Sequence, residues 1–204
     1  DPNEVISASE FDQVWKVVNA LRSHDAALGD ELDELRMKLG RGQKISLSGS
    51  KIIFDIHQTV GDEFIDAFET KLVETTTESW EFWYGLLQAY KEQHGDLRSP
   101  TKHRFNGFNL GFWSDNQRRL KEQMLPERKQ RLDGIGFVWD ILAAQWEEGF
   151  VALSAYKEEH GHCLVSGGHE INGFKLGQWV TRQRGNQVEL SVDRKQRLDR
   201  LNFI

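Results

Sequence analysis

Apolar side chains recur along most of this chain at the spacing of amphipathic helices. The clearest run contains Trp80, Trp83, Tyr84, Leu87 and Tyr90. A period of three to four residues places these side chains on one face of a helix, which can then bury them. Gly95 follows the run, and glycine readily takes the left-handed conformation that ends a helix. We therefore predict a helix from about Trp80 to His94.

The same sequence pattern occurs a second time, 66 residues further along the chain. Residues 80 to 138 align with residues 146 to 204 without a gap, and Trp146 falls on Trp80. The matched pieces are AYKEQHG with AYKEEHG, NGFNLGFW with NGFKLGQW, and RKQRLD with RKQRLD. Such self-similarity indicates two tandem copies of one small domain.

Each copy is predicted to contain three helices. A loop of about ten residues follows the first helix, and the second helix begins around the Asn-Gly-Phe sequence. A third, short helix begins near Pro126, a residue favoured at the first helical position. The expected core positions of the second and third helices are Leu110, Trp113, Leu120, Leu132 and Ile135 in the first copy, and Leu176, Trp179, Val180, Leu198 and Leu201 in the second. A core of this size is marginal, and the many Trp and Phe residues compensate because each buries a large apolar area.

The first 79 residues follow a different pattern. Ser7 to Glu10 form a capping-box sequence that opens a helix with Phe11, Val14, Trp15, Val18 and Leu21 on one face. A second helix, about Asp25 to Leu39, carries a leucine stripe, and a further helix is expected from about Gly61 to Glu74. Between them KISLSGSKIIFDI contains two β-branched runs joined at Ser48-Gly49, a pattern typical of a hairpin.

The predicted fold is therefore mainly α. Residues 1–79 form a helical hairpin with a small β-hairpin, and residues 80–140 and 141–204 form two tandem three-helix bundles. The leucine stripe and the isolated hairpin look incomplete alone, which suggests that residues 1–79 are the tail of something larger.

Composition narrows the class of protein. The chain has 204 residues, 38% hydrophobic and 11% aromatic, which is ordinary for a folded protein. No run approaches the roughly 18 apolar residues of a membrane span, and the stretch DPNEVISASE contains neither a basic nor an apolar signal region. Cys163 is the single cysteine, so it forms no internal disulfide, and one cysteine among scattered histidines makes no zinc set. We expect a cytoplasmic protein without a metal site and without a membrane partner.

Charge is unevenly distributed. The net charge is −6, yet residues 1–79 hold 8 Lys and Arg against 16 Asp and Glu, whereas residues 80–145 hold 10 against 8. The acidity is therefore N-terminal. A basic surface, if present, must be local to the repeats.

The repeat resembles the bacterial helicase-associated domain. The likeness rests on the Trp, AYKEEHG, NGFKLGQWVTRQR, RKQRLD and a final Phe, and it covers residues 80 to 204. That family occurs as tandem three-helix copies at the C-terminus of DEAD/DEAH-type helicases and is suspected of binding nucleic acid. SEFDQVWKVVNALRSHD is similar to the segment that follows the second motor domain. The second copy departs from the first, with Gly185 and Asn186 in place of Arg119 and Leu120.

The sequence motifs of an ATP-hydrolysing motor do not occur in this chain. A phosphate-gripping GxxxxGK[ST] sequence is absent, and Asp33-Glu34 is interpreted as a solvated helix face. No nucleophile, base and orienter are suggested by spacing. We predict no catalytic residues and no cofactor here; ATP and Mg²⁺ are expected only at the upstream helicase motor.

Cations of the second and third helices and of one loop are the candidate nucleic-acid contacts. Phosphate contacts position a protein without reading sequence, and an exposed ring can stack on a base. The predicted contacts are Lys102, Arg104, Phe112, Arg118, Arg119, Lys121, Lys129, Arg131, Lys175, Arg182, Arg184, Lys195 and Arg197. For Arg118 and Arg184 a structural salt bridge and a phosphate contact stay equally open. Lys129, Arg131, Lys195 and Arg197 are expected to be exposed.

Gln117 and Gln183 lie on the core side of the second helix, so we predict that they satisfy backbone groups of the preceding loop. The function that these patterns favour is a non-catalytic accessory region that binds nucleic acid, DNA more readily than RNA, beside helicase motor domains of the same protein. The alternative is a protein-interaction or rigidifying module that packs on the motor or on a partner.

Overall fold

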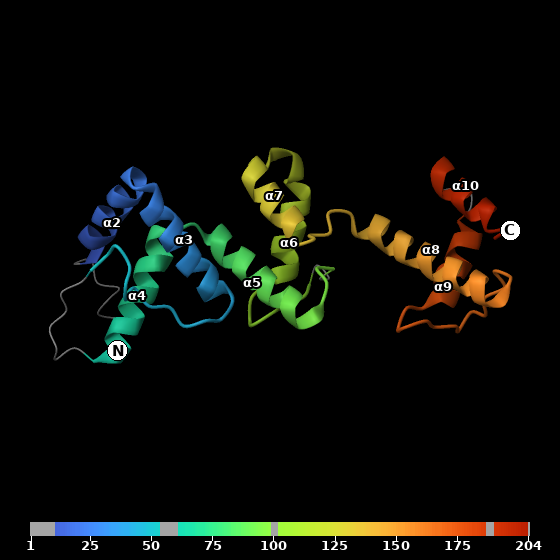
Figure 1. Ribbon diagram of the computed structural model, residues 1–204, viewed down its shortest axis with the longest axis horizontal. Coiled ribbons are helices and arrows are strands. Elements are labelled where there is room, and N and C mark those ends of the chain that lie inside the picture. The colour runs from blue at the N-terminus through green and yellow to red at the C-terminus, as the bar shows by residue number, and fades with distance from the viewer. Residues whose placement is uncertain (1–10, 54–60, 99–101, 187–189, 204) are drawn as a thin grey trace. The chain divides into compact units, whose positions relative to one another are not determined.

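The computed structural model describes residues 11–53, 61–98, 102–186 and 190–203. This part of the chain is mainly helical and contains no named strand. The chain divides into two compact units, Asp1–Phe137 and Val138–Ile204. The helices, drawn in Figure 1, are α2 (Asp12–His24), α3 (Ala26–Gly40), α4 (Asp62–Thr76), α5 (Ser79–His94), α6 (Leu110–Arg119), η2 (Lys121–Gln123), α7 (Pro126–Gly134), α8 (Ile141–His160), α9 (Leu176–Gly185) and α10 (Val192–Arg200).

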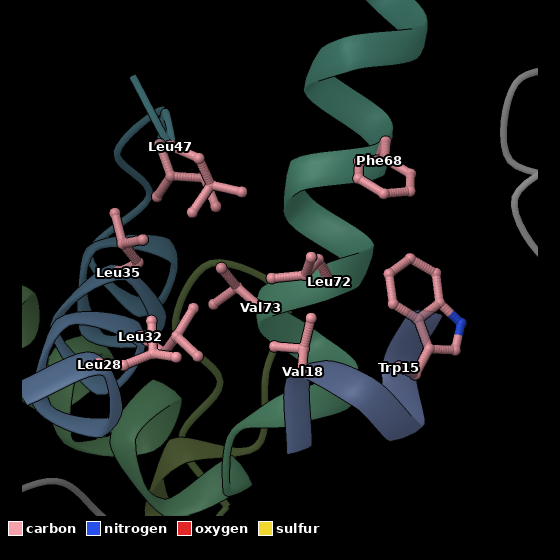
Figure 2. Close-up of a cluster of buried hydrophobic side chains, with 10 residues drawn as sticks. Trp15, Val18, Leu28, Leu32, Leu35, Leu47, Phe68, Leu72 and Val73 are labelled. Carbon is pink, nitrogen blue, oxygen red and sulfur yellow. The ribbon is translucent and has the colours of Figure 1, made fainter. Parts of the chain in front are cut away.

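The leucine stripe of α3 is covered within the first unit. Leu28, Leu32 and Leu35 are buried in a cluster with Leu72 and Val73 of α4, toward which they point in Figure 2. Asp25 caps α3 by accepting a hydrogen bond from the Leu28 amide at 3.1 Å. Trp15 and Val18 of α2 complete the core as predicted, but Leu21 is 52% exposed. The capping box at residues 7–10 lies outside the described residues.

The expected β-hairpin is not present in the described residues. Residues 44–53 contain no strand, and residues 54–56 of the predicted hairpin lie outside the description. Ile45 and Leu47 are buried in the N-terminal core, so these alternating apolar side chains pack in the same cluster as residues of α3 and α4. A turn follows, in which the Ser50 amide donates to the Leu47 carbonyl and Gly49 has φ +84°. Burial of one face, rather than strand pairing, therefore explains the β-like alternation.

Helix α3 also packs closely on α5, the first helix of the first repeat. A Cβ on Gly40 would lie 1.9 Å from the Phe82 carbonyl oxygen, and one on Gly85 would lie 2.1 Å from the Met37 carbonyl oxygen. Neither position has room for a side chain, because each faces the backbone of the other helix. Two glycines thus join residues 1–79 to the first repeat through direct backbone packing.

Each repeat forms the three predicted helices. Gly95 and Gly161 end α5 and α8 in the left-handed conformation, with φ of 82° and 76°. Helices α6 and α9 begin at Leu110 and Leu176, slightly later than expected, because the Asn-Gly residues form a separate turn. The buried residues of the second and third helices include Leu110, Trp113 and Leu132, and in the second repeat Leu176, Trp179, Val180 and Leu198. Leu120 was expected in the core but is 42% exposed.

Candidate nucleic-acid interface

A tight turn precedes the second helix of each repeat. Asn106 and Gly107 have φ of 48° and 83°, and the Phe105 and Phe108 backbones exchange two 2.9 Å hydrogen bonds across them. Positive φ at both central residues explains the Asn-Gly sequence, since these residues tolerate it best. Asn172 and Gly173 repeat this geometry in the second copy. The same hydrogen-bonded turn therefore precedes the second helix in both repeats.

The second glycine of the motif is required by close approach. The Gly177 amide donates to the His169 carbonyl at 3.0 Å, and a Cβ on Gly177 would lie 2.1 Å from the Ser166 carbonyl oxygen. Gly111 makes the same hydrogen bond to His103 in the first repeat. The start of the helix therefore lies directly on the preceding loop, which accounts for this glycine without a ligand.

The glutamines are structural, but their partner differs from the prediction. The Trp80 indole N–H donates to Gln117 Oε1 at 3.2 Å, and that of Trp146 donates to Gln183 Oε1 at 3.1 Å. All four residues are buried. The amides were expected to bond the backbone of the loop; they instead satisfy the one polar atom of the core tryptophan, which must have a partner when buried.

The arginines of the RKQRLD segment stack on those tryptophans. In the first repeat Arg128 and Arg131 lie over the Trp80 ring, 5.0 Å and 4.8 Å from its centroid. In the second, Arg194 and Arg197 lie 4.8 Å and 4.7 Å from the centroid of Trp146. In both repeats this segment therefore covers the core indole with two cations.

Arg131 and Arg197 are therefore not the free surface cations that the sequence suggested. Arg131 donates to both carboxylate oxygens of Glu81, at 3.0 Å and 2.6 Å, and Arg197 donates to both of Glu147, at 2.6 Å. Burial alone would lower the pKa of Arg131, but the hydrogen bonds that its guanidinium donates to the Glu81 carboxylate outweigh burial, and the pKa is raised. The hydrogen bond from Arg197 lowers the pKa of Glu147. Both arginines are half-buried parts of a structural network.

Lys129 and Lys195 occupy equivalent places with different surroundings. Lys129 is half-buried and pairs with Asp133 at 2.9 Å, one helical turn on. Lys195 is exposed, and within the described residues no carboxylate pairs with it. Lys121, in η2, is half-buried.

Arg118 forms a structural salt bridge, one of the two alternatives for these arginines, whereas Arg184 forms none within the described residues. Arg118 is an ion pair with Asp115 at 2.6 Å, and its side chain is only 11% exposed. Thr181 stands at the equivalent position of the second repeat, so Arg184 lacks that carboxylate; its guanidinium donates instead to the Cys163 carbonyl at 3.0 Å. Arg184 thus keeps its net charge. It lines a pocket of about 600 Å³ with Lys157, His162 and Phe203.

The remaining candidates are exposed around the turn and along the second helix. Lys102 and Arg104 lie before the turn, and Arg104 donates to the Gly107 carbonyl at 2.6 Å. Arg119 donates to Asn116 Oδ1 at 2.7 Å. Lys175 and Arg182 are exposed on the second repeat. None of these five cations has a carboxylate partner among the described residues.

Residues at intervals of three and four share one face of each second helix, which we call the outer face. In the first repeat it comprises the N-cap residue Asn109 with Phe112, Asn116 and Arg119 of α6; in the second it comprises the N-cap residue Lys175 with Gln178, Arg182 and Gly185 of α9. All but Asn116, which is half-buried, are exposed. The outer face is polar and aromatic in the first repeat and basic in the second.

An aromatic pocket of about 430 Å³ lies beside the outer face of α6. Its lining consists of Trp83, Gly107, Phe108, Asn109, Phe112, Trp113 and Asn116. The sequence marked Phe112 as exposed, and it is 60% exposed. It did not mark Trp83 and Phe108, because their helical and turn positions resemble core positions; Phe108 is 43% exposed.

The described residues contain neither a metal-binding cluster nor a membrane-spanning helix. Across the described ranges, no group of three His, Cys, Asp or Glu side chains is placed to hold a metal ion. No helix in the same ranges is long and apolar enough to cross a membrane.

Comparison with known families agrees with the internal repeat. The model of the helicase associated domain matches residues 77–140 and again residues 143–204. No curated protein and no solved structure matches the chain. Since the two matches cover more than half of its length, the chain belongs to the helicase associated domain family and carries that accessory domain twice in tandem.

Proposed function

We propose that this chain is a non-catalytic region of a helicase that binds nucleic acid mainly through phosphates, DNA in preference to RNA. The observation that supports it is the set of exposed cations without carboxylate partners in the described residues: Lys102, Arg104, Arg119, Lys175, Arg182, Arg184 and Lys195. Most of them lie on or next to the second helix of a repeat.

Pairing decides which arginines remain candidates. An arginine in a two-point bond with a carboxylate has its charge neutralised, and moving it to a phosphate would leave Glu81 or Glu147 without a partner. Arg104, Arg119 and Arg184 bond neutral oxygens, so their charge is still available to a polyanion. We therefore no longer propose Arg118, Lys129, Arg131 and Arg197 as phosphate contacts, and we propose the second-helix cations instead.

Net acidity is compatible with this proposal. The excess of carboxylates is concentrated in residues 1–79, whereas residues 80–145 carry more cations than anions. A local basic surface can bind phosphate even when the whole chain is negative. In this view ATP and Mg²⁺ belong to the helicase motor, and the accessory repeats hold the substrate near it.

Titration of salt tests the proposal. We expect the chain to bind a DNA duplex at ~50 mM salt, with a log–log slope of affinity against salt of about −0.9 for each phosphate contact. The triple variant Lys175→Ala, Arg182→Ala, Lys195→Ala should bind more weakly and show a shallower slope. The measurement is fluorescence anisotropy of a labelled duplex across a salt series.

A matched control removes the same charge elsewhere. Lys38, Lys44 and Lys51 pair with Glu34, Asp66 and Asp25, so their replacement by alanine changes the net charge equally but spares the outer face. Equal weakening by both triple variants would reduce the effect to net charge. A folded chain that binds no DNA at ~50 mM salt would contradict the proposal and favour the protein-interaction module.

A further inference from the structure

We propose that the aromatic pocket of the first repeat binds one unpaired base of a single-stranded nucleic acid. This inference rests on the proposed function and makes it more specific. The first repeat would hold a base and the phosphates that flank it, and the outer face of the second repeat would hold further phosphates.

The pocket offers flat apolar surfaces of the size of a base. Phe112 and Phe108 line it and are 60% and 43% exposed. The half-buried Trp83 stacks on Trp113 with ring centroids 6.1 Å apart and planes 9° apart. Phe108 meets the edge of Trp83 at 5.9 Å. Aromatic rings of this kind bind bases of any sequence, because every base has a π-face.

Polar groups surround these rings in the places that a nucleotide needs. The Asn109 side chain makes no capping hydrogen bond at the start of α6. Asn116 accepts from Arg119 through Oδ1, which leaves its amide N–H groups to donate. Both amides can therefore pair with the edge of a stacked base.

Two cations are hydrogen-bonded to residues that line the pocket. Arg119 is fixed by Asn116, a lining residue, and Arg104 is fixed by the carbonyl of Gly107, another lining residue. Each keeps a full positive charge, because its partner is neutral. A base in the pocket would have phosphates before and after it along the strand, and this charge arrangement fits them better than it fits an apolar peptide.

The second repeat shows that folding does not require this pocket. Gly149 replaces Trp83, Gln178 replaces Phe112, and Arg182 replaces Asn116. The Trp179 ring lies against the Gly149 backbone, 2.2 Å from where a Cβ would stand. Nevertheless both repeats keep the same Trp–Gln hydrogen bond and the same turn. Trp83 and Phe112 therefore have no structural role that the second repeat must also fill, whereas Phe108 is kept as Phe174, which packs against the second core.

A stacked duplex cannot insert a base into such a pocket without first unpairing it, which costs a few kcal/mol. Single strands are consequently the expected ligand. The test uses the full chain with a short oligothymidylate, an abasic strand of equal length and a duplex, all at ~50 mM salt. We expect the oligothymidylate to bind most tightly.

Phe112→Ala should weaken binding of the oligothymidylate by roughly five- to a hundredfold and leave the abasic strand unchanged. Phe112→Trp should retain binding, because it retains the ring. Gln178→Ala alters the equivalent position of the second repeat and should cause no loss that depends on bases. A 2-aminopurine in the strand should be quenched by the wild-type chain and not by Phe112→Ala.

The outcomes separate the two proposals. Equal affinity for the oligothymidylate and the abasic strand, with steep salt dependence retained, would overturn the base pocket and leave the phosphate-binding function standing. An unchanged affinity of Phe112→Ala for the oligothymidylate would also overturn it. Absence of binding to every strand would overturn both and leave the pocket as a surface for an apolar protein segment.

Discussion

The indole nitrogens of Trp80 and Trp146 determine much of what is repeated in this chain. Each donates to a buried glutamine on the second helix, and each ring is covered by arginines of the third. Helical periodicity places Gln117 and Gln183 toward the core, and the sequence therefore predicted that they are structural. It could not identify their partners, because the tryptophans are far away in sequence and meet the glutamines only when the bundle forms.

Replacing Gln183 by leucine should destabilise the second repeat by about 1–3 kcal/mol. The substitution nearly conserves volume but leaves the buried Trp146 N–H without an acceptor. Urea denaturation followed by tryptophan fluorescence measures the change in the free energy of unfolding.

Gln178→Leu is the control for that measurement. Gln178 is an exposed residue of the same helix, so this change should stay within about 0.5 kcal/mol of the wild type. Equal stability of the Gln183→Leu variant and the wild type would show that the hydrogen bond contributes nothing.

The helices were predictable as elements, whereas their crossings were not. The helical spacing of apolar residues and the glycines that follow it indicated α5 and α8, and the leucine stripe indicated α3. However, periodicity gives no distance between helices, so the backbone contact of α3 with α5 at Gly40 and Gly85 was not foreseen. The hairpin prediction failed for a related reason: alternation shows that one face of a segment is buried, and at Ile45 and Leu47 the burying surface is a helical core.

A methyl group at the crossing of α3 and α5 should be costly. Gly85→Ala places a Cβ against the Met37 carbonyl oxygen, and we expect a loss of roughly 3 kcal/mol or more from the stability of the first unit. Thermal and urea unfolding of the full chain measure this loss.

Gly134 provides the comparison, since no atom lies within 4 Å of its Cβ position. Gly134→Ala near the end of α7 should be neutral or stabilise by up to about 1 kcal/mol. A similar effect of the two substitutions would refute the close packing of α3 on α5.

At the scale of the whole molecule, the two compact units have unequal composition. The first combines residues 1–79 with one repeat, and the second contains the other repeat with its own core around Trp146, Leu153 and Leu176. The tandem family and the mainly α class followed from sequence. The distribution of free cations did not, because Arg118 and Arg184 have the same place in the repeat and differ only in the acid at position 115.

We expect residues 138–204 to fold as an isolated fragment and to unfold cooperatively. Their core is complete without other residues, although a domain of this size is marginally stable. Circular dichroism with urea titration tests this expectation.

Residues 1–79 in isolation should lose much of their helical signal, because α5 would be missing from the face of α3 that bears Gly40. A stable fragment 1–79 together with an unstructured fragment 138–204 would reverse the assignment of the units.

Gly149 has a consequence for how the repeats can exchange roles. The Trp179 ring occupies the space beside Gly149, so a large residue at position 149 would collide with this core ring. A single substitution therefore cannot give the second repeat a copy of the aromatic pocket. The reverse change, from Trp83 to glycine, would remove a wall of the pocket and leave the Trp80–Gln117 pair in place. A single substitution can thus remove the aromatic pocket from the first repeat, whereas a single substitution cannot create it in the second repeat.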